Sequence, residues 1–339
     1  MIFICTNRRY SGSFSSILVF ITFTSFWNYG DGVGLHREGN DYCYSDPECG
    51  PDSDSWGDTC QTGLRQSPIS LPHRPHLLPD VTALHLGSYR GDAFRMQNNG
   101  RTVHIEFLEQ PNHGHGPRPQ NHRPNHLNFV QNGFPIHAQM PFPFLGRYNR
   151  EESSAYYKFD SAHFHWGNRD DVGSEHCFED RCFSMELHLV HHLSNYDSMS
   201  EALESGDSNA LAVIAVMLDV TPAAGHGNPV LAPIVNNIFQ IEESSHDEHV
   251  YINQPLDFSP LLATTSKPFV YSYKGSLTTP DCDEQVNWFV FKKPIAISHR
   301  DVHAFRFLRD SKGNLLRENH RPIQNRNGRA IFLSAVKPI

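Results

Sequence analysis

The amino-acid sequence predicts a mainly β protein of the α+β class, in which short helices flank a large sheet. Short apolar or alternating runs recur between turns rich in Gly, Pro, Asn and Asp, as in 103–107 (VHIEF) and 211–218 (LAVIAVML). Few segments have the 3.6-residue apolar repeat of a helix, and the candidates 198–204, 229–241 and 300–308 are short. The 339 residues are compatible with a single all-β domain.

The N-terminal region has the pattern of a secretory signal. Arg8 and Arg9 precede an apolar run over 17–27, which is shorter than the roughly 20 residues that a membrane-spanning helix needs. We expect residues 1–30, approximately, to be removed as a signal peptide, with an uncleaved anchor as the alternative. The remaining chain is then expected to be secreted and extracellular, with no membrane span.

The cysteine count fits an exported protein. Six of the seven cysteines follow residue 30, and an even number in a secreted chain is typical of disulfides. Six cysteines allow many pairings, so the count alone fixes none. Two pairs are close enough in sequence to close short loops, which leaves a third. These pairs are Cys43–Cys49, Cys177–Cys182 and Cys60–Cys282.

Residues 108–155, approximately, interrupt the strand pattern with a stretch rich in Pro, Asn and His, and we expect a mobile surface insertion there. Histidine-rich tracts can bind metals, so contact with a second metal or a mineral is an alternative to a solvated loop. The histidines concerned are His113, His115, His122 and His126. The net charge of −9 argues against a nucleic-acid partner.

The segment 161–167 (SAHFHWG) carries a His-x-His pair. On a strand this spacing places His163 and His165 on one face, because side chains alternate. A second predicted strand, 185–192 (MELHLVHH), can pair antiparallel with the first and bring His188 opposite. Three neutral imidazoles around an open position are typical of a catalytic Zn²⁺ site.

His191 and His192 compete with His188 for the third position. Glu186 favours His188, because the two residues share a face of the strand and a carboxylate orients a zinc-bound imidazole.

Four sequence blocks, in order, resemble the signature of the alpha-class carbonic anhydrases. They are 163–167 (HFHWG), 173–176 (GSEH), 186–191 (ELHLVH) and 276–280 (SLTTP). Weaker matches extend the resemblance over nearly everything after Tyr42 except the insertion, and they define one domain over 42–339. The resemblance implies a twisted, mostly antiparallel sheet of about ten strands with zinc at the bottom of a conical cleft.

The resemblance also implies the chemistry: reversible hydration of carbon dioxide to bicarbonate and a proton, by zinc-hydroxide attack. Zinc lowers the pKa of its bound water to about 7, the value known for carbonic anhydrases. Thr278, Glu175 and Tyr44 would be catalytic, and Glu186, Ser161 and Asn319 would support the zinc histidines. The pocket for carbon dioxide would be lined by Val190, Val213, Leu277, Thr279, Val286 and Trp288. Cys60 and Cys282 would pair, as in exported members.

Two positions depart from the family pattern. Arg101 stands where fast members carry a proton-shuttle histidine, and a guanidinium stays protonated at physiological pH. We therefore predict a buffer-dependent enzyme, with His104 as the candidate substitute. Ser161 replaces a longer amide that supports His163. Two other functions stay open: a non-catalytic carbonic-anhydrase-like matrix or binding protein, and a zinc esterase.

Overall fold

The computed structural model describes residues 42–77, 84–108, 137–141, 154–245, 247–263 and 268–338. The expected signal peptide and the four histidines of the expected insertion lie outside these residues.

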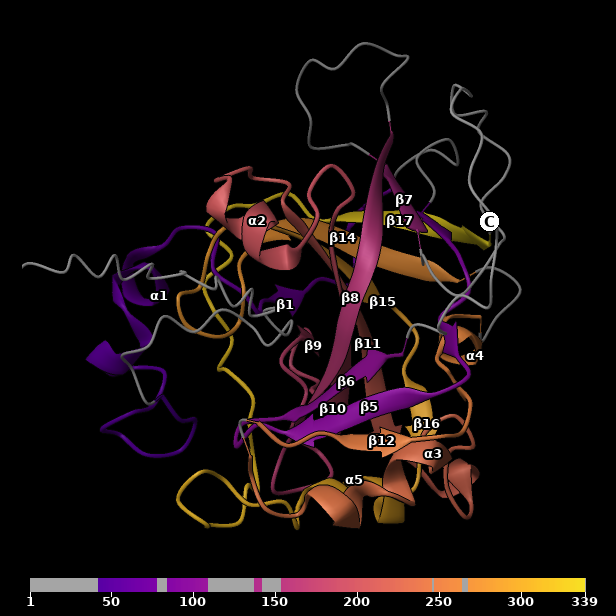
Figure 1. The fold of residues 1–339 in the computed structure, drawn as a ribbon. Coiled ribbons are helices and arrows are strands. Elements are labelled where there is room, and N and C mark those ends of the chain that lie inside the picture. The colour runs from indigo at the N-terminus through magenta and orange to yellow at the C-terminus, as the bar shows by residue number, and fades with distance from the viewer. Residues whose placement is uncertain are drawn as a thin grey trace, which may run out of the picture.

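A large twisted sheet of 13 strands dominates the fold (Figure 1). Its order is β10-β11-β15-β14-β17-β3-β7-β8-β6-β5-β12, with β16 beside β11, β2 beside β17, and a further pairing of β8 with β10. The strands are β2 (His76–Leu77), β3 (Leu84–Leu86), β5 (Phe94–Asn98), β6 (Val103–Phe107), β7 (His137–Pro141), β8 (Ser154–Trp166), β10 (Met185–Leu193), β11 (Leu211–Val220), β12 (Val250–Ile252), β14 (Phe269–Gly275), β15 (Val286–Phe291), β16 (Ile295–Ile297) and β17 (Phe332–Pro338).

Most pairings in this sheet are antiparallel, but β11 runs parallel to β15 and β16, and β17 runs parallel to β2 and β3. Two small two-stranded sheets accompany it. They are formed by β1 (Ser70–Leu71) with β9 (Cys177–Phe178), and by β4 (Arg90–Gly91) with β13 (Leu256–Asp257). The mainly β prediction is confirmed, and the main sheet is larger than the expected ten strands.

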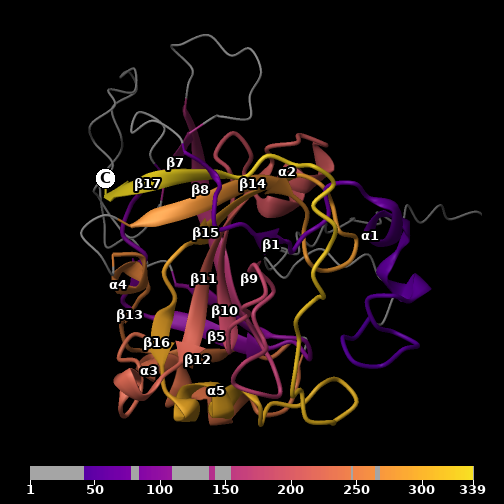
Figure 2. The same cartoon turned by 180° about the vertical axis from the view of Figure 1, so that it is seen from behind.

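The helices are short and lie around the sheet (Figures 1 and 2). They are η1 (Asp54–Trp56), α1 (Asp58–Thr62), α2 (Met199–Glu204), η3 (Pro222–Ala224), α3 (Ala232–Val235), η4 (Ile238–Ile241), α4 (Ser259–Leu262) and α5 (His299–Phe305). Ser198 caps α2, and Ser298 forms a capping box with Asp301 at the start of α5. The prediction of one helix over 229–241 is wrong. The segment forms two short elements, because α3 ends at Val235 and the 3-10 helix η4 follows.

The expected insertion over 108–155 contains part of the sheet. Strand β7 pairs with β3 on one side and with the first residues of β8 on the other, and β8 already begins at Ser154. The prediction of a continuous surface insertion therefore needs correction. β7 lies inside a stretch rich in Pro and Asn, and this composition is typical of loops, so the sequence pattern did not predict a strand there.

The two faces of β10 pack against different surroundings. Leu187 and Leu189 belong to the larger core cluster, which includes α5 and η4, whereas Val190 joins a second cluster with Val213 and Trp288. Both faces are buried, so β10 is almost continuously shielded from water. The histidines on β10 are therefore largely shielded from water.

Three disulfides are present, Cys43–Cys49, Cys60–Cys282 and Cys177–Cys182, and these are the expected pairs. Cys60–Cys282 joins α1 to the loop before β15.

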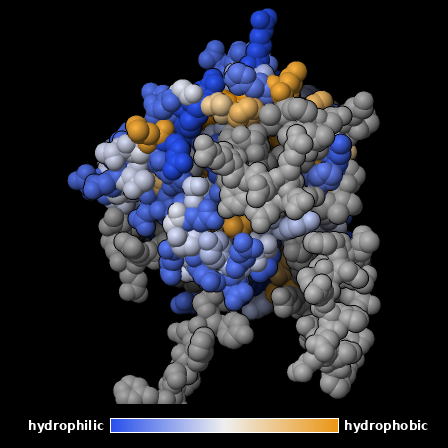
Figure 3. Space-filling model, turned by 90° about the horizontal axis from the view of Figure 1, so that it is seen from above, coloured by the Kyte–Doolittle hydropathy of each residue, from blue (hydrophilic) through white to orange (hydrophobic). Residues whose placement is uncertain are grey.

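None of the helices in the described part of the chain is long and apolar enough to cross a membrane. The described side chains visible in Figure 3 are mainly hydrophilic, with hydrophobic ones in small groups.

Candidate active site

Three histidines from two neighbouring strands converge on one point. His163 and His165 lie on β8, His188 lies on β10, and the antiparallel register places His188 directly opposite His163. Nδ1 of His188 is 3.1 Å from Nε2 of His163 and 3.1 Å from Nε2 of His165. The strand alternation that suggested the His-x-His pair is therefore present in the structure.

The outer nitrogens of two of these rings are engaged by acceptors. Nδ1 of His165 donates to the Asn319 carbonyl at 2.8 Å, and Nε2 of His188 donates to Oε1 of Glu186 at 2.7 Å. A neutral imidazole has only one N–H, so the inner nitrogens of both rings present lone pairs. Two lone pairs cannot hydrogen-bond to each other, whereas a shared metal cation would accept both. The donor set fits zinc, and the three histidines form a candidate metal group.

The electrostatics favour neutral rings. Burial, reinforced by the neighbouring histidines, lowers the pKa of His163 well below its usual value, and burial lowers the pKa of His165 to about 4. The pKa of His188 is also lowered, chiefly by burial. Neutral imidazoles are the form that binds a metal.

Glu186 is held from two sides. Burial alone would raise its pKa, but the charges and hydrogen bonds of His176 and His188 lower it, so the carboxylate is ionised. His176 donates to Glu186 through Nδ1 and through its backbone N–H, each at 2.7 Å. His176, Glu186 and His188 are a second candidate metal group, but the hydrogen bonds between them already satisfy these atoms. His176 ends the 173–176 (GSEH) block, but the sequence pattern indicated no role for it.

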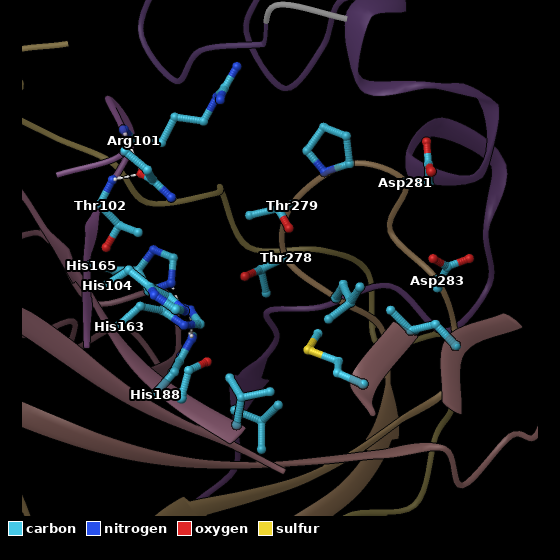
Figure 4. Close-up of a pocket in the computed structure, with 18 of the residues that line it drawn as sticks. Arg101, Thr102, His104, His163, His165, His188, Thr278, Thr279, Asp281 and Asp283 are labelled. Atoms are coloured by element: carbon cyan, nitrogen blue, oxygen red, sulfur yellow. Dashed lines mark hydrogen bonds between the residues drawn. The ribbon is translucent and has the colours of Figure 1, made fainter. Parts of the chain in front are cut away.

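Glu175 is fully buried behind the histidines. Its Oε1 accepts the backbone N–H of Arg321 at 3.0 Å and lies 3.4 Å from Nδ1 of His165. Burial raises the pKa of Glu175, and the neighbouring His188 and Thr278 side chains act against that rise. Its Oε2 is buried without a hydrogen-bond partner of normal geometry among the described residues. Thr278 lies across the cavity from the histidines (Figure 4).

A cavity of about 520 Å³ opens over the three histidines. Five of the residues expected at the substrate pocket line it, and these are Val190, Val213, Leu277, Thr279 and Trp288. Val286 differs from its prediction, because it is completely buried in the cluster behind the cavity and does not line it. Other lining residues were not predicted. Those within two residues of an expected catalytic, shuttle or pocket residue are Tyr42, Asn99, Thr102, Pro280 and Asp281, whereas Thr59, Met199, Leu203, Glu204 and Asp283 lie further from these positions in the sequence.

Arg101, His104 and Tyr44 also line the cavity. The guanidinium of Arg101 lies 4.2 Å from the ring centre of Tyr42, and its Nε donates to the Tyr42 carbonyl at 3.2 Å. Figure 4 shows that the Arg101 side chain points away from the three histidines. His104 is buried, which lowers its pKa, and burial also raises the pKa of Tyr44 well above its usual value.

Ser161 lines the cavity two residues before His163, on the same strand. Among the described residues, the one hydrogen-bond contact of the His163 ring is with His188. Nδ1 of His163 therefore lacks the support that the other two rings receive from Asn319 and Glu186.

Comparisons with known proteins agree with this geometry. The model of the family "Eukaryotic-type carbonic anhydrase" matches residues 51–335. A putative carbonic anhydrase 5 of Caenorhabditis elegans is 32% identical over 296 residues, covering 84% of this chain and 79% of the relative. Human carbonic anhydrase 7 is 27% identical, covering 80% of this chain and 89% of the relative. Carbonic anhydrase 1 of Monodelphis domestica is 36% identical, covering 51% of this chain and 63% of the relative.

The family match spans almost the whole described chain and includes all three converging histidines. The chain therefore belongs to the eukaryotic-type carbonic anhydrase family and is a carbonic anhydrase, a lyase that interconverts carbon dioxide and bicarbonate.

Proposed function

We propose that the protein hydrates carbon dioxide reversibly to bicarbonate and a proton with zinc held by His163, His165 and His188. The observation that carries the proposal is the pair of inner nitrogens, on His165 and His188, that face each other at 3.1 Å with lone pairs. When bound, zinc lowers the pKa of a coordinated water to about 7, as is known for carbonic anhydrases.

Asn319 and Glu186 fix the rings. By accepting hydrogen bonds from the N–H groups of His165 and His188, they hold each ring in the tautomer that presents a lone pair to the metal. The ionised Glu186 also makes the His188 ring a stronger donor. We assign no comparable partner to His163, so Ser161 is expected to leave zinc affinity somewhat lower than a longer amide would.

Thr278 and Glu175 orient the reacting water. In this proposal the Thr278 hydroxyl donates to the otherwise unpartnered Oε2 of Glu175, so the Thr278 oxygen is left to accept a hydrogen bond from the water. That bond selects one lone pair of the water for attack. Tyr44 keeps its hydroxyl proton, since burial raises its pKa, and it serves as a polar cavity wall.

The apolar wall receives carbon dioxide. Val190, Val213 and Trp288 are 4%, 2% and 2% exposed and lie on the same side of the cavity as His188. Carbon dioxide has no net charge, so a dry wall can hold it beside the histidines without binding bicarbonate strongly. Leu277 and Thr279 complete this wall.

Proton release limits turnover in this proposal. Arg101 cannot give up a proton at physiological pH. His104 is a poor substitute, because burial lowers its pKa and leaves little of the charged form. Protons therefore leave with the help of external buffer.

We also propose that the chain is exported after removal of residues 1–30. Three disulfides, which persist in oxidising compartments, support this proposal.

Stopped-flow hydration of carbon dioxide tests the function. The zinc-loaded protein should turn over, and His188→Ala should lose zinc and activity, whereas His303→Ala, an exposed change outside the cavity, should keep both. Stoichiometric zinc without turnover would overturn the proposal.

A further inference from the structure

A second group of imidazoles and carboxylates, formed by His104, Glu106, Asp160 and His192, adjoins the cavity, and His104 itself lines it. His104 on β6 is the register partner of His163 on β8, so β6, β8 and β10 lie side by side here. Glu106 follows His104 by two residues and therefore shares its face of the sheet.

Asp160 and His192 extend this face along β8 and β10. Asp160 lies where the pairing of β8 with β10 shifts, between the register pairs of Ser161 and Phe159. His192 follows Val190, which lines the cavity, by two residues on β10. The carboxylates of Asp160 and Glu106 both act electrostatically on His104, so the four side chains form one neighbourhood.

Several atoms of this group are buried without a hydrogen bond. His192 is 6% exposed, and neither of its ring nitrogens has a partner. Oδ2 of Asp160 and Oε1 of Glu106 are also buried and unpartnered. Buried polar atoms are normally satisfied, and leaving one unpaired costs free energy. These four atoms offer donors and acceptors to a ligand.

The spacing of these atoms suits a metal ion. Nδ1 of His192 lies 3.5 Å from Oδ1 of Asp160, and Nδ1 of His104 lies 3.5 Å from Oε1 of Glu106. These separations are long for hydrogen bonds. Two ligands that each lie about 2.1 Å from one tetrahedral ion are about 3.4 Å apart.

The charge also favours a cation. Arg95 donates to Oε2 of Glu106 at 2.8 Å and neutralises that carboxylate. Asp160 has no arginine or lysine partner among the described ion pairs, so its charge remains for a ligand.

We propose that His104, Glu106, Asp160 and His192 form a second site for a divalent transition metal with the preferences of Zn²⁺, independent of the three-histidine site. Imidazole and carboxylate together are ligands that zinc accepts. In the described residues the four side chains stand as two pairs rather than one convergent group. A shared ion would require the two pairs to approach each other by side-chain rotation.

Zn²⁺ titration of the full metal-depleted chain, followed by calorimetry, tests the site. Asp160→Asn and His192→Gln should each weaken one zinc equivalent at least tenfold and keep the equivalent that His188→Ala removes. The matched controls Asp180→Asn and His226→Gln change exposed residues outside the group and should bind as the unmodified chain does. Binding by the Asp160 and His192 variants that equals the controls would overturn the proposal.

A second measurement needs no variant. In ¹H–¹⁵N spectra of the unmodified protein, the second Zn²⁺ equivalent should shift the ring nitrogens of His104 and His192. Unshifted rings at two equivalents would refute the site even if the chain takes up further zinc elsewhere.

Discussion

Oε1 of Glu186 accepts the Nε2–H of His188 at 2.7 Å, and this contact determines which nitrogen of His188 faces the cavity. The same oxygen accepts Nδ1–H of His176 at 2.7 Å. The metal-facing lone pair of His188 thus depends on a carboxylate that never reaches the cavity surface.

Glu186→Gln should weaken zinc binding by about 10–100-fold, because an amide is a poorer acceptor and leaves one of the two histidines without its partner. Competition with a chelator would measure the change. Glu204→Gln is the matched control, since Glu204 also lines the cavity but its carboxylate lies near the Ser200 hydroxyl and not against any of the three histidines. Equal zinc affinity in the two variants would show that Glu186 does not support the metal.

Arg101→His should speed proton release. In weakly buffered medium we expect turnover to rise about tenfold or more, because imidazole is a general acid–base group near neutral pH. Added imidazole should stimulate the unmodified protein strongly and the variant much less. Arg101→Gln should stay buffer-dependent, since it removes the charge without adding a shuttle. A similar rise in turnover in both variants would show that loss of the Arg101 charge, and not proton transfer by an imidazole, causes the effect.

Much of the site follows from local pattern. The two-residue period of a strand puts His163 and His165 together, and the register that places His188 opposite His163 needs only an antiparallel partner. Val286 shows the limit of such reasoning. Trp288, two residues further along β15, lines the cavity, but Val286 is completely buried in the second core cluster between its strand neighbours Leu211 and Gly275.

Long-range contacts were not predictable from the sequence. Met199 and Leu203 reach the cavity because α2 packs over β10 and β11, which no local pattern specifies. Likewise β7 joins the sheet through pairings with β3 and β8, although its own sequence lies among loop-forming residues.

The Cys60–Cys282 disulfide should contribute more stability than Cys177–Cys182. The first joins residues 222 apart in sequence and the second joins residues 5 apart, and the entropy removed from the unfolded chain grows with loop length. We expect replacement of Cys60 and Cys282 by serine to lower the free energy of unfolding by about 2–5 kcal/mol. Urea unfolding of both double-serine variants would compare them, and a larger loss in the Cys177/Cys182 variant would contradict the entropic account.

Acid should destabilise the fold through His191. Burial lowers the pKa of His191 to about 4, although Nδ1 donates to the Ala212 carbonyl at 3.3 Å, and Nε2 lies 2.8 Å from the Tyr89 hydroxyl. The unfolded chain takes up a proton near pH 6.5, whereas the folded chain does so only near pH 4. Stability that is present above pH 6.5 is therefore lost as the pH falls towards 4, by roughly 3 kcal/mol at most.

His191→Gln removes this titration while keeping a donor and an acceptor. Its free energy of unfolding, measured in urea under zinc saturation, should fall less between pH 7 and pH 4.5 than that of the unmodified protein. His303→Gln, which removes an exposed histidine, should leave the pH dependence unchanged. If His191→Gln loses stability with the same slope as the unmodified chain, the proton that drives acid unfolding binds elsewhere, and the buried Tyr89–His191 pair is pH-insensitive over this range.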